Sequence, residues 1–208
     1  MITFPYAGLC YFQQRKKIGE HATLCCFNPP MHRQPFKQLL ADYEAVDPEL
    51  SVTQQFIEFV EEYADCFERS LEIGHITGSA WIIDPTKQKA LLVHHKKLGF
   101  WLQPGGHCDG DSDVARVAQK ETREESGLKE FSIYKDRIYD LDIHRIPDWK
   151  DVPAHINYDV RFLIHADSEQ SLHLSEESND IAWFDLNNLA DVIQDKSVLR
   201  LAEKSICT

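Results

Sequence analysis

The chain has 208 residues, of which 43% are hydrophobic and 27% are charged, a composition typical of a soluble globular protein. Its 34 acidic and 22 basic side chains give a formal net charge of −12, which argues against a surface for nucleic acid or for an anionic membrane. The length permits one domain with a sizeable core, alone or with a helical appendage.

Hydropathy and cysteine spacing predict a cytoplasmic protein. The N-terminal segment lacks the basic and apolar regions of a signal peptide, and no run approaches the roughly 18 apolar residues that span a membrane. The six cysteines include no C-x-x-C pair and do not resemble a disulfide framework, so we expect reduced thiols. A zinc site near the N-terminus is conceivable, but its spacing is not typical of structural zinc. Its ligands would be His21, Cys25, Cys26 and His32.

Residues 1–71 are predicted to form an N-terminal helical extension. Residues 36–46 are weakly helical in pattern, and a second helix begins near Ser51, which forms a plausible capping box with Gln54. The apolar stripe of this second helix has to pack on the main domain or on a partner subunit, so the pattern allows a homodimer. The stripe consists of Val52, Phe56, Phe59, Val60, Tyr63 and Phe67.

Residues 72–208 are predicted to form the main domain, in which strands and helices are mixed. Strands at 79–84 and 90–95 are joined by a turn, and a short run at 99–103 leads into a Pro-Gly-Gly sequence. Further strands are expected near 132–144, 155–165 and 181–184, with helices near 186–192 and 197–203. Mixed strands covered by helices predict the α/β (α+β) class, arranged as a sandwich.

One further helix carries three carboxylates close to its C-terminal end. It begins after residues 111–113, which are N-cap types, and it stops at Gly127. Glu121, Glu124 and Glu125 are three and four residues apart, so they share one side of the helix. Two carboxylates about 4 Å apart repel by roughly 4 kcal/mol at an effective dielectric constant of about 20, and the helix dipole adds to the cost. A divalent cation would relieve this repulsion, so the sequence predicts a metal site.

The stretch from Gly106 to Leu128 resembles the Nudix box. That signature runs Gly, five residues, Glu, seven residues, then Arg-Glu-aliphatic-x-Glu-Glu-x-Gly-aliphatic, and the spacing here is the same. Six of its nine defined positions match, namely Gly106, Glu121, Glu124, Glu125, Gly127 and Leu128. The three departures are Ser112 for the first Glu, Lys120 for the Arg and Thr122 for the first aliphatic residue.

The resemblance implies a Nudix-like α/β/α sandwich with a mixed sheet. It also implies a hydrolase that cleaves a phosphoanhydride of a nucleoside diphosphate linked to another group, so the expected partner is a small nucleotide-type substrate. The implied cofactor is Mg²⁺ or Mn²⁺, held by Glu121, Glu124 and Glu125 together with the backbone carbonyl of Gly105. Glu121 and Glu124 are the box residues that we expect to be catalytic.

The departures from the signature keep other interpretations open. Ser112 cannot carry the negative charge of a glutamate, and Lys120 keeps the charge of an arginine but loses its bidentate geometry. The alternative to an enzyme is therefore a Nudix-like module that binds a nucleotide or sugar phosphate without catalysis. A third interpretation treats the glutamates as a solvated helix face, which predicts that Mg²⁺ leaves the melting temperature unchanged.

The general base is expected from an acidic loop late in the chain or from the box itself. Many members of the family take a carboxylate from a late loop, and Glu176 and Glu177 occupy a similar position just before the last predicted strand. A solvated acidic loop without a catalytic role is the alternative.

Candidate substrate contacts alternate along the predicted strand 155–165. His155, Asn157, Asp159 and Arg161 fall on one face of that strand, and Arg161 is the best phosphate clamp among them. An ordinary half-exposed strand would show the same alternation. The further candidates are His107 and Lys120, with Phe100 or Trp101 for stacking on a base.

Overall fold

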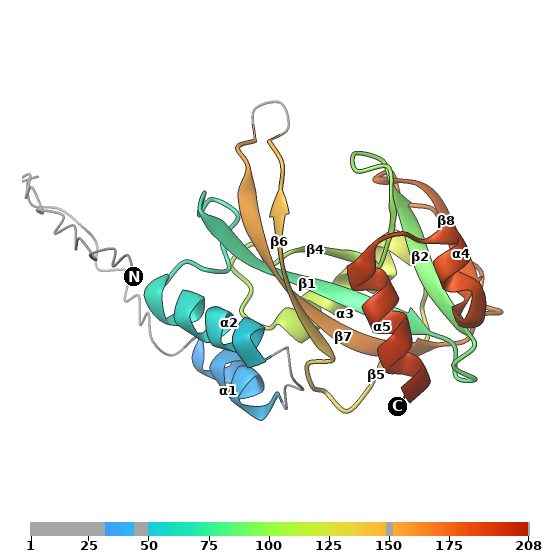
Figure 1. Ribbon diagram of the computed structural model, residues 1–208, viewed down its shortest axis with the longest axis horizontal. Helices are drawn as coiled ribbons and strands as arrows, with labels where there is room; N and C mark the ends of the chain where they lie inside the picture. Colours follow the sequence, from blue (N-terminus) through green and yellow to red (C-terminus); the bar gives the residue numbers. More distant parts are fainter. Residues whose placement is uncertain (1–31, 44–49, 149–151, 208) are drawn as a thin grey trace, which may run out of the picture.

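The computed structural model describes residues 32–43, 50–148 and 152–207. Its centre is an eight-stranded sheet with helices on both faces (Figure 1). The strands are β1 (Gly74–Ile83), β2 (Lys89–His95), β3 (Trp101–Leu102), β4 (Gly105–His107), β5 (Phe131–Ile133), β6 (Asp140–Ile146), β7 (His155–Ala166) and β8 (Ser178–Asp185). The helices are α1 (Gln34–Asp42), α2 (Leu50–Glu62), α3 (Val114–Ser126), the 3₁₀ turn η1 (Leu186–Asn188), α4 (Leu189–Val192) and α5 (Lys196–Cys207).

β1 and β7 form the spine of the sheet. They pair in parallel from Gly74 opposite Ile156 to Ile83 opposite His165. On its other side β1 pairs with β4 and then with β2, while β7 pairs with β6 and then with β5. These other pairings, and those of β2 with β3 and β8, are antiparallel. The mixed sheet and the α/β class predicted from the sequence are confirmed.

Alternate side chains of β1 enter two separate cores. Ile76 and Ile82 pack with Val117 of α3, in a core that also includes α1 and α2. Trp81 and Ile83 face the other way and pack beneath α4 and α5. Figure 1 shows the resulting layers, with α1 to α3 on one face of the sheet and α4 and α5 on the other. This is the predicted α/β/α sandwich.

The N-terminal helices pack on the main sheet through the apolar stripe of α2. Phe56 and Phe59 are buried, and the ring of Phe59 stacks on Tyr158 of β7 with 3.9 Å between the ring centroids. α1 contributes Phe36, which meets Phe67 edge-on at 5.5 Å. The sequence allowed the stripe to pack either on the main domain or on a partner subunit. In the described residues it packs on the main domain, and the homodimer stays a prediction.

α2, β4 and the strand expected at 132–144 differ from the sequence expectations. α2 ends at Glu62, so Phe67 joins the core from the turns that follow the helix. The expected strand at 132–144 is two strands, β5 and β6, because the chain turns between them through Lys135 and Asp136, which have φ of 57° and 44°. β4 was not expected at all, because glycine has a low strand propensity and only pairing with β1 makes this segment a strand.

Some predictions fall outside what the structure describes. His21, Cys25 and Cys26 of the conceivable zinc site lie in the part of the chain that is not described. The division between residues 1–71 and 72–208 also stays a prediction. Within the described ranges, no helix has the length and apolar character that crossing a membrane requires.

α3 begins and ends where its capping residues predict. The side chain of Asp113 accepts the backbone N–H of Arg116 at 3.1 Å. Gly127 has φ of 72°, a left-handed conformation that favours glycine, and it donates its N–H to the carbonyl of Arg123 at 3.0 Å. Because both ends of the helix are fixed, the direction of its three glutamates is fixed as well.

Candidate active site

Two glutamates of α3 lie against the two glycines of β4. A Cβ atom on Gly106 would lie 2.6 Å from Oε1 of Glu121, so only glycine fits at this position while that carboxylate stays in place. One residue earlier, Gly105 donates its backbone N–H to Oε1 of Glu125 at 2.8 Å. The glycine pair therefore lets the strand approach both carboxylates closely.

These two carboxylates are poorly compensated when they are charged. Burial raises the pKa of Glu125 to about 7, against the opposing effect of its backbone hydrogen bond. Burial also raises the pKa of Glu121, although Nζ of Lys120 lies 3.3 Å from its Oε1 and acts in the opposite direction. The negative charges of Glu124 and Glu177 push both pKa values further up. The pair is short of positive charge.

The third carboxylate, Glu124, is oriented toward Lys120. Its side chain is exposed, and its Oε2 lies 3.0 Å from Nζ of that lysine. Among the described residues, the three glutamates do not form a group of side chains positioned to share one ion, so a shared ion would require side-chain rotation. The donor set suits Mg²⁺ or Mn²⁺, because hard cations prefer carboxylate and carbonyl oxygens.

Glu177 reaches the pair from the loop before β8. The backbone N–H of Lys96 donates to the carbonyl of Glu177 at 3.0 Å, which fixes this loop beside the end of β2. The charge of Glu177 adds to the effect of burial on the pKa of Glu121 and Glu125. Glu176 binds Nζ of Lys96 through its backbone carbonyl at 2.5 Å, and its side chain is exposed. Of the two candidate bases, the structure brings Glu177 into the electrostatic range of the box.

The acidic residues on either side of Ser112 are used at the start of α3. Asp113 caps the helix, and Oδ1 of Asp111 accepts from Nη2 of Arg116 at 2.6 Å. The same oxygen of Asp111 accepts the backbone N–H of Asp113 at 2.9 Å. Both neighbouring carboxylates therefore have partners at the helix start.

A buried polar row runs along β1 and β7. Asp159 accepts hydrogen bonds from Thr77 at 3.0 Å and from Ser79 at 2.7 Å. Two oxygens, Oε1 of Gln103 and Oδ1 of Asn157, are buried without a hydrogen-bond partner. Buried oxygens of this kind are normally hydrogen-bonded, so they are positions at which a ligand hydroxyl or a water can donate.

Arg161 lies in the core. Its side chain is 2% exposed, and its guanidinium contacts Asp140 at 3.2 Å, Asp142 at 3.3 Å and Asp159 at 2.8 Å. Nη2 also donates to the hydroxyl of Ser197 at 3.1 Å. All three nitrogens have protein partners, a placement that favours a structural role over the phosphate contact predicted from the sequence.

Comparison with known proteins assigns this arrangement to a family. The family model of the NUDIX domain matches residues 75–202, which is more than half of the chain. The chain belongs to the Nudix hydrolase family. An uncharacterized Nudix hydrolase, YvcI from Bacillus subtilis (strain 168), is 25% identical over 112 residues. The match covers 51% of this chain and 65% of that protein, so it spans slightly less than two thirds of the relative's length.

Solved structures agree with this assignment at the level of the fold. A Caenorhabditis elegans Ap4A hydrolase in a binary complex is 18% identical with a TM-score of 0.52, covering 62% of this chain and 93% of that one. A MutT protein from Methanosarcina mazei Go1 is 17% identical with a TM-score of 0.52, covering 65% of this chain and 94% of that one. At these identities the likeness shows the fold alone.

Two predicted substrate contacts of the Nudix domain, His107 and His155, lie beside a histidine that the sequence analysis did not consider. The ring centroid of His75 is 4.9 Å from that of His107 and 4.8 Å from that of His155. The first strand was expected to begin at residue 79, whereas β1 begins at Gly74. With the correct start, the two-residue alternation would have placed His75 on the same face as Thr77.

Arg69 is a second residue that sequence reasoning missed. It forms an exposed ion pair with Asp109, which raises its pKa, and the charges of Glu177 and Glu121 act in the same direction. Arg69 precedes the residues that the NUDIX model matches. The segment predicted as an extension therefore supplies a cation close to the Nudix box.

The two aromatic candidates for base stacking are placed differently. Trp101 packs edge-on against Phe184, with ring centroids 4.8 Å apart. Phe100 is 62% exposed and lines a surface pocket together with Val192 and Ile193. Phe100 is therefore the more accessible of the two.

Proposed function

We propose that this chain is a Nudix hydrolase that depends on Mg²⁺ or Mn²⁺ and cleaves a phosphoanhydride of a nucleoside diphosphate linked to another group. The observation that carries the proposal is the close approach of Glu121 to Gly106 and of Glu125 to Gly105. Burial at this position raises the pKa of both carboxylates. A cytoplasmic location and a small-molecule partner belong to the same proposal.

The residues present suit a hard divalent cation. Glu121 and Glu125 would supply oxygens, Glu124 would supply a third after rotating away from Lys120, and Gly105, whose N–H donates to Glu125, would add its backbone carbonyl. When bound, such an ion neutralises the pyrophosphate and lowers the pKa of a water molecule. The cation would also supply the positive charge that Lys120 alone does not.

Other side chains would act as the general base and contact the substrate. Glu177, which acts electrostatically on Glu121 and Glu125, is our candidate to accept the proton of the attacking water, and a box glutamate is the other candidate base. The unpaired oxygens of Gln103 and Asn157 can accept hydroxyl groups of the substrate. Arg69 can contact a phosphate once its exposed pair with Asp109 opens, and such a pair contributes little to stability.

The test is turnover of a panel of nucleoside diphosphate derivatives in the presence of Mg²⁺ or Mn²⁺. We expect release of a monophosphate, lost on removal of the metal and lowered about 10²- to 10³-fold by Glu121→Gln, as is usual when one electrostatic contact to the transition state is lost. Glu130→Gln is the matched control, because it removes an equally negative side chain from an exposed position outside the box. Equal activity in the two variants would contradict the proposal.

A non-catalytic binding module is the second candidate, and position 112 favours it. Ser112 has no carboxylate, and the neighbouring Asp111 and Asp113 are held by Arg116 and by the helix start. Under this alternative no substrate of the panel turns over although metal still binds. Activity that appears or rises sharply in Ser112→Glu would then identify a site that has lost its catalytic acid.

A further inference from the structure

Three histidines converge at one rim of the sheet. His75 is near the start of β1, His155 is the first residue of β7, and His107 is the last residue of β4. Their ligand nitrogens lie within 4.8 Å of one another, as those of a shared metal ion must. We propose that this histidine trio binds a transition-metal ion, with zinc preferred, at a site separate from the glutamates of the Nudix box.

The strand register explains why the three side chains face the same way. Thr77 lies opposite His107 on one side and opposite Asp159 on the other, so these residues share a face of the sheet. His75 is two residues from Thr77, and His155 is four residues from Asp159, so both keep that face. Backbone pairing thus brings the trio together, with no need for a mobile loop.

Two of the rings have their Nδ1 atoms beside backbone carbonyls. Nδ1 of His155 lies 2.9 Å from the carbonyl oxygen of Pro153, and Nδ1 of His75 lies 3.5 Å from that of Leu71. A carbonyl only accepts, so in each neutral ring the hydrogen is on Nδ1 and the lone pair is on Nε2. Metal-bound histidines are oriented by the same kind of outer hydrogen bond.

Among the residues that the structure describes, the Nε2 atom of His75 has no hydrogen-bond partner. His75 is 3% exposed, and its Nε2 is buried without a hydrogen bond. A buried acceptor left in this state is unfavourable. His155 cannot relieve it, because in the tautomer set by Pro153 its own Nε2 is also an acceptor. A cation between the rings satisfies both lone pairs.

The ligand type separates this site from the glutamates. Imidazole nitrogens suit zinc, copper and nickel, whereas Mg²⁺ takes oxygen ligands. Three protein ligands leave a fourth tetrahedral position for water or for an anionic ligand. Nitrogens bound at about 2.0–2.1 Å to one tetrahedral zinc are about 3.4 Å apart, so the rings have to close by about 1 Å. The charged residues near the trio, Arg69 and Asp109, form an ion pair with each other. Their effects on a cation bound by the histidines therefore have opposite signs.

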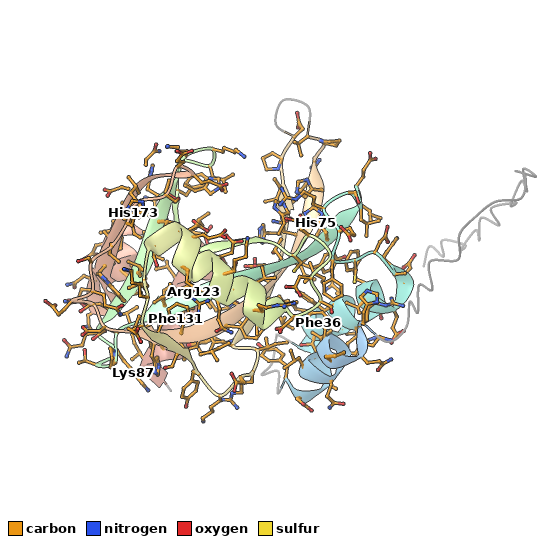
Figure 2. The ribbon with its side chains drawn as sticks, turned by 180° about the vertical axis from the view of Figure 1, so that it is seen from behind. Phe36, His75, Lys87, Arg123, Phe131 and His173 are labelled. Carbon is orange, nitrogen blue, oxygen red and sulfur yellow. The ribbon has the colours of Figure 1, made fainter. Side chains whose placement is uncertain are left out.

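The test measures zinc binding to the full chain by calorimetry and by metal analysis, with Mg²⁺ in excess and no substrate present. We expect one zinc per chain, and an affinity that falls at least about 100-fold in His155→Gln, since even the loss of a second-shell partner costs 10- to 100-fold. Glu121→Gln and His173→Gln are expected to bind zinc as the wild type does. His173 is the matched control, because it is exposed and lies well apart from His75 (Figure 2).

Either of two results overturns the proposal: zinc binding that survives His155→Gln, or zinc binding that is lost in Glu121→Gln. X-ray absorption at the zinc edge of the wild-type protein decides the question even if the histidine variant does not fold. Scattering from three imidazole rings is expected, and a shell of oxygens alone contradicts the site. Because none of these measurements uses turnover, failure of the proposed hydrolase activity leaves them interpretable.

Discussion

Two clusters of three carboxylates lie in this protein, and they differ in the cations around them. The aspartate cluster consists of Asp140, Asp142 and Asp159, and the glutamate cluster consists of Glu121, Glu124 and Glu125. Arg161 contacts all three members of the first, and Arg200 and Lys204 approach Asp140 to 2.7 Å and 2.8 Å. In the described part of the chain, the basic side chain that contacts the glutamate cluster is Lys120.

The pKa values follow this difference. Burial by itself would raise the pKa of Asp140 and Asp142. Arg200 and Arg161 lower the pKa of Asp140 below its ordinary range, and the hydrogen bond with His144, together with Arg161 and Arg200, does the same for Asp142. In the glutamate cluster burial prevails, and the pKa of Glu125 rises to about 7. Acidic residues that fold together with their own cations hold the structure together. Acidic residues that are buried without enough cations have raised pKa values, and it is here that we propose an exchangeable cation.

The largest effect is expected from removing the central cation of the aspartate cluster. Arg161→Met leaves buried carboxylates without their partner, so the free energy of unfolding should fall by about 3–5 kcal/mol in urea denaturation. Arg116→Met is the control, since its side chain is 67% exposed and its loss should cost no more than about 1 kcal/mol. Unchanged stability with weakened substrate binding would instead support the phosphate clamp predicted from the sequence.

The second prediction concerns the metal-free protein between pH 5 and pH 8. The folded pKa of Glu125, about 7, exceeds its ordinary value, so its contribution to stability is lost as pH rises through that interval, by about 3 kcal/mol. The raised pKa values of Glu121 and His144 act in the same direction. Burial lowers the pKa of four other histidines, whose contribution to stability therefore increases as pH rises toward about 6.5 and opposes that of Glu125. These are His75, His95, His107 and His165. The lowered pKa values of Asp140 and Asp142 act only in acid, where stability falls as pH drops below about 4.

Thermal unfolding with chelator present, measured across this pH range, tests the profile. The effect of Glu125 is isolated by comparison with Glu125→Gln: the wild type should lose stability relative to this variant as pH rises from about 5 to about 8. Addition of Mg²⁺ at pH 8 should restore much of the loss. A difference between the two proteins that does not change above pH 5, together with no response to Mg²⁺, would favour the interpretation of the glutamates as a solvated helix face.

A somewhat smaller effect is expected from Glu125→Gln. The neutral side chain keeps an oxygen to accept the N–H of Gly105 but carries no buried charge, so the metal-free variant should be more stable than the wild type at pH 8 by about 2 kcal/mol. It should also lose the stabilisation by Mg²⁺. Glu130→Gln, which changes an exposed charge, should show neither effect.

The smallest effect is expected from Lys120→Ala. The lysine side chain is 57% exposed, so loss of its contacts with Glu121 and Glu124 should lower the metal-free stability by no more than about 0.5 kcal/mol. The response to Mg²⁺ should remain, because Lys120 supplies no metal ligand. A large loss of stability would mean that the glutamate cluster has a built-in cation after all, and the contrast between the two clusters would fail.

Much of the box could be predicted because its signals are local. Asp113 and Gly127 mark the ends of α3 by their side-chain chemistry, and the spacing of Glu121 and Glu125 places both on one side of any helix. The strand content of residues 74–185 was also largely visible as apolar runs. Local signals did not predict segments such as β4, which is a strand only because it pairs with β1.

The face proposed to bind substrate was harder to predict because strand alternation does not say what covers each face. The sequence correctly grouped His155, Asp159 and Arg161 on one side of a strand, but it could not show that α5 covers part of that side. The end of β7 near Ser197 is buried, so Arg161 meets carboxylates there, while His155 at the other end stays partly exposed. One face of β7 therefore carries a buried ion cluster at one end and a partly exposed histidine at the other.

Local spacing along the chain was enough to predict chemistry that lies on a single element, since a helix sets residues three and four apart side by side whatever surrounds it. The glutamate cluster and the Nudix box are of this kind. The pairing of charges, and the contacts between side chains from distant strands, depend instead on how the elements pack together. Pairing between strands depends on long-range register, and this register brings Arg161 to its aspartates and gathers His75, His107 and His155 at one rim.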